Sequence, residues 1–494
     1  MYANDPVSAA VNDVLKNFVP PLPPSVKQHE AYAHQASPTL DAMIEYIRHW
    51  ATRSYEGYFE GVALWVLSTI AARRVVLPWQ EGVWTNLYIM LVADSTQSAK
   101  TKAAAYGLKI LQDCRLTFLL APEEITPQKL LSKMSGVNAT VPRNYALMDH
   151  VQESNFRRKL AFSGQKGWLY DEFGDMLQEI VKGKGNSGLF YKLLKKLYDN
   201  RESFTYDTRS WGEEEIGMPY LSILGTVPPS SLKPIMGADS AMWTDGAIAR
   251  MAWITAPRGK PQLDSAPDGE AIVPSLVINN LRAWHDRLGE PVCTITEKED
   301  SEDGKKKGAQ YDIARSPLSQ TPIYWSGSGV REAHQLYYEK LVMLAHDYQL
   351  DVRFKSTYGR LPDMALKIAM LLASLENNDH MDMRHWGRGQ QITERWRTDF
   401  HELVAQLAEG NETKSYGILE EKVIEEMTTK MNPGEKRNSR FISRLGSSLL
   451  KKEGSPEVRK VLDELSGAGQ IGKFGNGRAA IYWILTDEEK EAMK

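Results

Sequence analysis

The chain has 494 residues, of which 42% are hydrophobic, and a formal net charge of −3 at pH 7. This length can bury a sizeable core and predicts roughly two to four domains. The near-neutral charge excludes a polycation, so any nucleic-acid surface must be local. The two cysteines, Cys114 and Cys293, lack metal-like spacing and indicate a reducing compartment.

No secretory signal is predicted, because the N-terminus lacks a basic region followed by an apolar run. The most apolar segment, Val62–Ala72, is about eleven residues long and ends at Arg73-Arg74, too short to span a bilayer. We therefore expect a soluble, cytoplasmic protein with no membrane partner.

Residues 1–38 contain VPPLPPS and are predicted to form a flexible tail or partner-binding arm. Within residues 39–84, helical spacing of apolar residues from Leu40 to Ala72 predicts two helices that pack against the following sheet. The apolar run Leu87–Val92 then predicts a strand buried on both faces of a parallel sheet.

A small polar turn, Lys100-Thr101 and a helix follow this strand, which is the layout of a nucleotide phosphate loop. Asp94 and Ala99 stand where that motif has glycines, which let the backbone approach phosphates closely. The alternative is an ordinary strand-to-helix turn. The candidate phosphate-binding residues are Asp94, Ser95, Thr96, Gln97, Ser98, Ala99, Lys100 and Thr101.

Short strands are predicted at 119–121 and 145–148, around a helix at 127–134. The next apolar segment, Gly167–Tyr170, leads directly into Asp171-Glu172, the form of a strand that delivers an acidic pair at its carboxyl end. In ATPases such an Asp holds the magnesium shell and the Glu polarises the attacking water. The alternative is a surface Asp-Glu pair.

The glycine-rich segment 182–188 is either a flexible turn or a loop that offers Lys182 and Lys184 to a polyanion. The predicted strand 220–226 ends at Thr226, which would lie beside the γ-phosphate; the alternative is a simple strand end. Arg250 precedes another apolar strand. It either projects toward a neighbouring subunit's nucleotide or pairs with a local carboxylate.

Residues 263–320 are predicted to be a linker, with a mobile, mixed-charge insertion from about 286. Residues 321–410 are predicted to form a helical lid. Arg360 precedes a strongly apolar helix there, and either reaches a bound nucleotide or lies in solvent at a helix start.

Residues 411–486 show a winged-helix pattern, with predicted helices at 415–431, 439–452 and 456–466. A hairpin of 471–474 and 478–484 follows, joined by Gly475-Asn476-Gly477. Residues 436–452 carry six Lys/Arg and no Asp/Glu. This local basic surface predicts DNA contact; protein docking is the alternative. The candidate DNA contacts here are Arg437, Arg440, Arg444, Lys473 and Arg478, and residues 487–494 form a charged tail.

The order of these features resembles the ATPase core of AAA+ helicases. It looks most like the minichromosome-maintenance-like replicative helicases of phages, plasmids and mobile cassettes, whose ATPase domain often follows a primase–polymerase. The resemblance covers about residues 40–409. It implies an α/β fold, with an AAA+ P-loop core and parallel sheet at 85–262, a helical lid and a C-terminal winged helix.

The resemblance also implies roles for single residues. Lys100 and Thr101 match the phosphate-loop Lys and Thr, and Asp171 and Glu172 match the acidic pair. Three further residues match the remaining parts of such a site: Thr226 the sensor beside the γ-phosphate, where many relatives have Asn; Arg250 the arginine finger; and Arg360 the second sensor.

These assignments predict a mobile-element DNA helicase or translocase that forms a ring, expected to be a hexamer. It would hydrolyse ATP with Mg²⁺ at subunit interfaces, with Thr101 and Asp171 as metal ligands, and move along single-stranded or origin DNA. The residues before the core leave no room for a primase–polymerase, so a separately encoded one is an expected partner.

Two other functions remain open from the sequence. One is a non-hydrolysing scaffold that binds DNA or a partner and has a degenerate phosphate loop. The other is a motor that remodels protein or packages DNA. The sequence also leaves open whether Arg209 shares or replaces the role of Arg250.

Overall fold

The structure is a computed structural model. It describes residues 19–94, 99–123, 125–136, 141–142, 144–181, 187–199, 202–208, 212–235, 237, 240–244, 246–258, 265, 267–297, 311–327, 329–445, 448–467, 470–487 and 489. The chain divides into two compact units, unit 1 (Met1–Ala405) and unit 2 (Gln406–Lys494).

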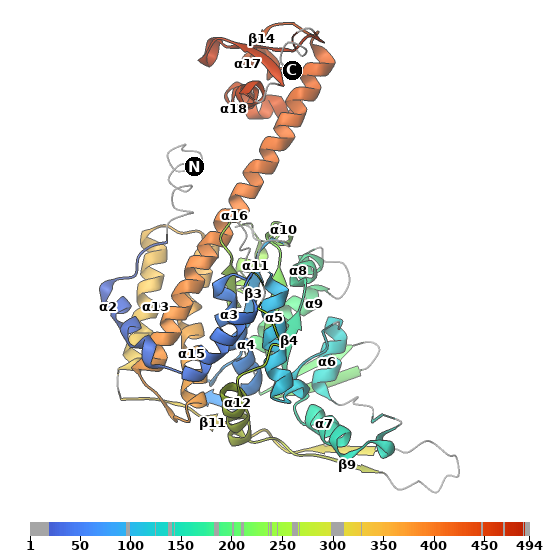
Figure 1. Cartoon of the computed structure of the whole chain (residues 1–494), viewed down its shortest axis with the longest axis vertical. Helices are drawn as coiled ribbons and strands as arrows, with labels where there is room; N and C mark the ends of the chain where they lie inside the picture. Colours follow the sequence, from blue (N-terminus) through green and yellow to red (C-terminus); the bar gives the residue numbers. More distant parts are fainter. Residues whose placement is uncertain are drawn as a thin grey trace, which may run out of the picture. The chain divides into compact units, whose positions relative to one another are not determined.

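Unit 1 combines helices with short strands (Figure 1). Its α-helices are α2 (Pro24–Lys27), α3 (Pro38–Trp50), α4 (Glu56–Ala71), α5 (Lys100–Asp113), α6 (Pro127–Ser135), α7 (His150–Ala161), α8 (Phe173–Val181), α9 (Ser187–Tyr198), α10 (Pro229–Leu232), α11 (Ala241–Thr244), α12 (Ser275–Leu288), α13 (Val330–Asp347), α14 (Val352–Tyr358), α15 (Leu361–Leu375) and the start of α16 (Met383–Lys430). Its strands are β1 (Val75–Leu77), β2 (Val83–Trp84), β3 (Tyr88–Val92), β4 (Gln165–Tyr170), β5 (Ser203–Thr208), β6 (Gly212–Gly217), β7 (Tyr220–Val227), β8 (Met251–Thr255), β9 (Cys293–Glu297), β10 (Tyr311–Arg315), β11 (Thr321–Pro322), β12 (Tyr324–Trp325) and β13 (His380–Met381).

The central sheet has the strand order β4-β7-β3-β8. Its neighbouring strands are all parallel, with Met90 opposite Gly225 on one side and Trp253 on the other. The mixed α/β class and the four apolar strands predicted from the sequence are therefore confirmed. Because the strands are parallel, all their carboxyl ends lie at one edge of the sheet.

Helix α4 forms the centre of the core beside this sheet (Figure 1) and contacts β3, β4, β7 and β8. Every residue from Tyr58 to Ala71 is buried. A helix that is apolar all round is typical of such a fully covered position. The predicted pair of helices at 40–72 is confirmed as α3 and α4.

Two predicted strands in unit 1 are wrong. Residues 117–119 and 145–147 form 3₁₀ turns, and only Leu120 joins the sheet, through an isolated parallel bridge to Gly167. Apolar runs as short as these are compatible with either a strand or a turn, and the outcome depends on whether a neighbouring strand pairs with them.

The predicted mobile insertion and N-terminal tail also differ from the structure. Residues 293–297 and 311–315 pair as an antiparallel hairpin, because Cys293 and Ile295 alternate with exposed residues and pack against Leu160. From residue 19 the N-terminal segment is packed rather than a tail. Val26 is fully buried, and its carbonyl accepts a hydrogen bond from Gln390 at 3.1 Å.

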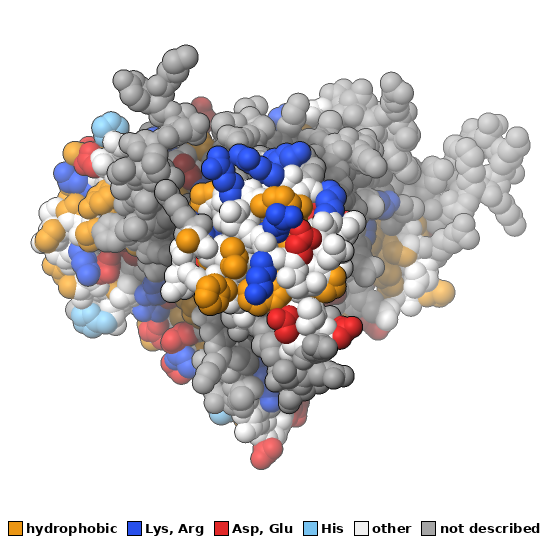
Figure 2. All heavy atoms as spheres, turned by 90° about the horizontal axis from the view of Figure 1, so that it is seen from above, with side chains coloured by type: hydrophobic (Ala, Val, Ile, Leu, Met, Phe, Trp, Pro, Cys, Tyr) orange, Lys and Arg blue, Asp and Glu red, His pale blue; other side chains and the backbone are white. Residues whose placement is uncertain are grey.

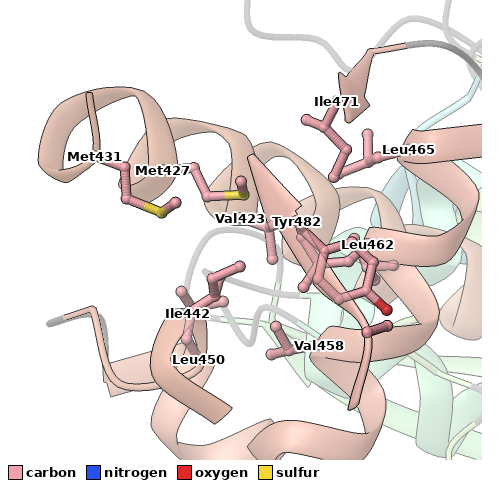
Figure 3. Packing of buried hydrophobic residues seen from close by; sticks show 12 residues of the cluster. Val423, Met427, Met431, Ile442, Leu450, Val458, Leu462, Leu465, Ile471 and Tyr482 are labelled. Atoms are coloured by element: carbon pink, nitrogen blue, oxygen red, sulfur yellow. The ribbon is translucent and has the colours of Figure 1, made fainter. Parts of the chain in front are cut away.

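Unit 2 consists of the last part of α16, then β14 (Arg437–Asn438), α17 (Ser439–Ile442), α18 (Ser448–Gly467), β15 (Ile471–Phe474) and β16 (Ile481–Ile484). The three strands form an antiparallel sheet in the order β14-β16-β15. Val423 and Met427 of α16, Leu462 of α18 and Tyr482 of β16 meet in its buried core (Figure 3).

The predicted hairpin is confirmed as β15 and β16, although β16 begins at Ile481 rather than at 478. The predicted helix boundaries are wrong. Residues 415–430 continue α16, α17 ends at Ile442, and α18 runs through Pro456. A proline removes only its own N–H from the helix ladder, so a long packed helix tolerates it. No described helix is long and apolar enough to cross a bilayer.

Candidate functional site

The candidate site lies where β3, β4 and β7 end, at the carboxyl edge of the parallel sheet. The strand order places β7 between β3 and β4, so residues from distant parts of the sequence meet there. The start of α5 adds Lys100 and Thr101 to this edge. Its N-cap residue, Ala99, makes no side-chain capping bond. The first N–H groups of a helix favour an anion at such a position.

Lys100 is buried, with 9% of its surface exposed. Its ammonium donates a hydrogen bond to the carbonyl oxygen of Ala93 at the end of β3. Burial lowers the pKa of Lys100, while Asp171 and Asp94 act in the opposite direction. Asp94, which replaces a motif glycine, thus contributes negative charge close to the lysine.

Asp171 connects the three segments of this edge. Its Oδ1 accepts hydrogen bonds from the hydroxyl of Thr101, at 3.4 Å, and from the hydroxyl of Thr226. The backbone N–H of Glu172 donates to Thr226 Oγ1 at 3.3 Å. The side chains of Asp171 and Glu172 remain exposed. The three predicted groups, phosphate-loop Thr, acidic pair and Thr226, are therefore brought together.

Two non-glycine residues of this site have a left-handed backbone, Ala99 with φ 25° and Glu172 with φ 58°. Such conformations are strained for residues with a Cβ and often occur at functional sites. The Ser54 hydroxyl donates to the Ala99 carbonyl at 3.0 Å, and the Tyr58 hydroxyl donates to the Val92 carbonyl at 2.6 Å. No motif marks these two supporting residues, which are far from the loop in sequence.

The donor set fits a magnesium ion. Mg²⁺ prefers oxygen ligands and keeps waters and substrate phosphates in its shell, so one or two protein ligands suffice. Thr101 and Asp171 supply a hydroxyl and an exposed carboxylate that already lie within hydrogen-bonding distance. The described residues contain no larger cluster of His, Cys, Asp and Glu that would hold a different kind of metal.

Arg250 does not project from the subunit. Its side chain is 10% exposed and forms an ion pair with Asp199, with Nε and Nη2 both donating to the carboxylate at 3.1–3.2 Å. Nη1 donates to the Gly246 carbonyl at 2.8 Å. Of the two interpretations of the sequence, the single chain shows pairing with a local carboxylate.

Arg250 lies at the opposite edge of the sheet from Lys100, because it directly precedes β8, whose first residue, Met251, pairs with Tyr88 at the start of β3. The ammonium of Lys367 lies at the same edge, where it donates to the Asn86 side chain at 2.8 Å just before β3 begins. Lys100 binds Ala93, just after β3 ends. Seven extended residues separate these points by roughly 20 Å. Arg360, at the start of α15, has a 37% exposed side chain that lies 3.9 Å from the carboxylate of Asp363, and its role as a second sensor stays a prediction.

In unit 2, Arg440 and Arg444 are exposed, and the described residues offer them no ion-pair partner. Figure 2 looks onto this unit and shows Lys and Arg side chains gathered along part of its face. Arg437 instead pairs with Glu435 at 2.7 Å, and Lys473 pairs with Asp463 at 2.9 Å. The predicted basic surface is thus narrower than the sequence suggested.

Several predicted residues lie outside the described residues. These are Ser95, Thr96, Gln97 and Ser98 of the phosphate loop, Lys182 and Lys184 of the glycine-rich segment, and Arg209. The side chain of Arg478 belongs with them, although its backbone is described.

The sequence matches no protein-family model and is similar to no curated protein.

Proposed function

We propose that the chain is an ATP hydrolase of the AAA+ type that moves along single-stranded DNA. The observation that supports this most is the convergence of Lys100, Thr101, Asp171, Glu172 and Thr226 at one edge of the sheet. A phosphate-binding cation, magnesium ligands, a carboxylate for water and a polar γ-phosphate contact are the parts that ATP hydrolysis requires.

Each of these residues has a distinct role in the proposed reaction. Lys100 exchanges its hydrogen bond with the Ala93 carbonyl for one with the β- and γ-phosphates. Thr101 and Asp171 hold Mg²⁺, which when bound neutralises phosphate charge. Glu172, held by the strained turn after β4, accepts a proton from the attacking water. Thr226 donates to the γ-phosphate once its bond to Asp171 is released.

The proposed enzyme forms a ring of subunits, in which Arg250 acts as the arginine finger. Arg250 lies at the edge of the sheet opposite to the Lys100 of its own chain, so it would act on the nucleotide of another subunit. In this role, the ion pair with Asp199 either opens to release the Arg250 guanidinium or stays closed and holds the guanidinium in position. Mixing Lys100→Ala subunits with Arg250→Ala subunits tests this. If each site uses Lys100 of one subunit and Arg250 of the next, some sites in a mixed ring are intact and part of the ATP turnover returns. If each site uses both residues of one subunit, no ATP turnover returns.

Unit 2 would contact DNA through Arg440 and Arg444. Its helices and three-stranded sheet are the elements of a winged helix, and exposed arginines with no acidic partner among the described residues favour contact with phosphates. Such contacts are independent of base sequence and weaken with salt.

The first experiment measures ATP turnover by the full chain alone, with oligo-dT and with duplex DNA. Glu172→Gln is expected to lower turnover at least a hundredfold, since general-base removal costs about 10²–10⁴. Asp175→Asn, an exposed carboxylate three residues away, is the matched control and should keep full turnover. Oligo-dT should stimulate turnover more than duplex DNA does. Equal turnover in Glu172→Gln and the wild type would contradict the mechanism.

The second candidate is a scaffold that binds DNA without hydrolysing ATP. It is favoured by Asp94 and Ala99, because a carboxylate repels phosphate and Ala99 already has strained backbone. Absence of turnover by the wild type together with DNA binding would select this function. Stimulation by a protein substrate instead of DNA would select a protein-remodelling motor.

A further inference from the structure

A second site lies in unit 1, between α6 and α7 beside the outer strand β4 (Figure 1). It is a cavity of about 340 Å³, at the lower end of the size of small-ligand sites. None of its lining residues belongs to the candidate nucleotide site. They lie within residues 120–122, 129–136 and 156–166.

The floor of the cavity is apolar. Leu130 and Met134 of α6 are each 1% exposed, and Leu160 of α7 is 8% exposed. Leu120 and Phe156 complete this surface. A space of this size and composition can accept one large aliphatic or aromatic side chain.

Four lysines surround the apolar floor, and no lining residue is acidic. Lys129 and Lys133 extend from the same face of α6, and Lys159 extends from α7, all three exposed. Lys166 is buried, and its ammonium donates to the carbonyl oxygens of Phe118, at 3.0 Å, and Lys159, at 3.4 Å. Like charges four residues apart on a helix are destabilising, so this grouping has a cost to the fold.

The lysines are close enough to repel one another. Burial, followed by the charges of Lys159 and Lys133, lowers the pKa of Lys166 to about 7. Lys159 and Lys129 likewise add to the effect of burial in lowering the pKa of Lys133. No carboxylate is among the causes for either group. An anionic ligand would relieve this repulsion.

We propose that this cavity binds an acidic segment of a partner protein, with one apolar side chain in the cavity and neighbouring carboxylates paired with Lys129, Lys133 and Lys159. The charge of the rim selects an acidic occupant, and the enclosed apolar floor selects a side chain. Sites for single-stranded DNA instead have several aromatic rings along a groove, whereas Phe156 is the one aromatic residue that lines this cavity.

The acidic run at residues 299–303 of this chain is a poor match for the cavity. Residues 299–303 read Glu-Asp-Ser-Glu-Asp and contain no apolar side chain. A separate protein that presents aspartates or glutamates beside a Phe, Leu or Ile fits the cavity better. The site does not depend on ATP hydrolysis and extends the proposed function with a docking surface.

The test measures fluorescence anisotropy of labelled peptides with the full chain. The main probe has four aspartates followed by phenylalanine, and two others carry alanine for phenylalanine or asparagines for aspartates. We expect the main probe to bind and each altered probe to lose at least tenfold in affinity. Absence of binding by the main probe, or equal binding of all three, would overturn the proposal.

Two protein variants locate the binding. Lys133→Glu with Lys159→Glu reverses the rim charge, and Ser132→Trp fills the cavity from a partly exposed position without removing a core side chain. Each variant should weaken binding of the main probe at least tenfold and leave the far-ultraviolet circular dichroism spectrum of the protein unchanged. Lys355→Glu, an exposed lysine of α14, is the control. Unchanged affinity in both variants, or displacement of the probe by oligo-dT at the same site, would overturn the peptide proposal.

Discussion

The buried carboxyl of Asp399 in α16 predicts a pH-dependent stability that one isosteric change should remove. Asp399 is 7% exposed and accepts a hydrogen bond from the Tyr55 hydroxyl at 3.0 Å. Burial raises the pKa of Asp399 from 3.8 to about 8, against smaller opposite effects of Tyr55, Arg395 and the Thr255 backbone. Between about pH 4 and pH 8, the Asp399 carboxyl is therefore protonated and neutral in the native state, whereas the same carboxyl is ionised in the unfolded state.

The sign and size of the effect follow from linkage. Between pH 4 and pH 8 the native state holds a proton that the unfolded state has lost, so the stability of the wild type falls as pH rises. Each pH unit in this window costs about 1.4 kcal/mol. From pH 5 to pH 8 the loss from this group is about 4 kcal/mol. Above pH 8 the loss stops growing, because both states are ionised.

Asp399→Asn keeps an acceptor for Tyr55 and removes the titration. We expect the variant to match the wild type within about 1 kcal/mol near pH 5 and to have a higher thermal midpoint at pH 8, by several degrees. Tryptophan fluorescence is the suitable signal because it reports mainly on unit 1, which contains Asp399. Trp483 is the only tryptophan of unit 2. Asp175→Asn serves as the control. Parallel midpoint curves for Asp399→Asn and the wild type from pH 5 to pH 9 would refute the reasoning.

Three further changes test the site and the packing. Ala99→Gly should relieve left-handed strain of about 1 kcal/mol and keep or raise ATP turnover; lower turnover would argue against a phosphate loop. Asp199→Ala should lower the thermal midpoint by leaving Arg250 unpaired, at a cost of about 1–2 kcal/mol because Asp199 is half exposed; an unchanged midpoint would show that the pair adds nothing. Gly387→Ala would place a Cβ 2.3 Å from the backbone oxygen of His29, so proteolysis of residues 24–35 should accelerate. Gly359→Ala, whose nearest neighbour lies at 3.6 Å, should not have this effect.

Most residues of the candidate site could be predicted from the sequence, because they lie at the ends of apolar strands. Asp171 directly follows the apolar end of β4, Thr226 lies near the end of the fully buried β7, and Lys100 follows the fully buried β3. Parallel strands share one carboxyl edge, so local patterns along the chain were enough to predict that these residues meet. The backbone strain at Ala99 and Glu172 was not predictable, because nothing in the residue types requires a positive φ there.

The remaining features depend on partners that are distant in sequence. The sequence is equally compatible with an Arg250 that projects from the subunit and one that pairs with a local carboxylate. Its pairing depends on Asp199, 51 residues earlier in the chain. Residues 293–315 read as a charged loop until β9 pairs with β10 and both pack on Leu160. The lysine-lined cavity likewise requires α6, α7 and β4 to be placed together.

The sequence by itself determined the class of the fold, the buried strands and the residues at their ends, because hydrophobic periodicity and strand direction are local properties. Only the tertiary structure decided which charges are paired, which edge of the sheet Arg250 occupies and where a cavity remains. Those properties arise from contacts between segments far apart in the chain, and their energies depend on burial that no single segment encodes.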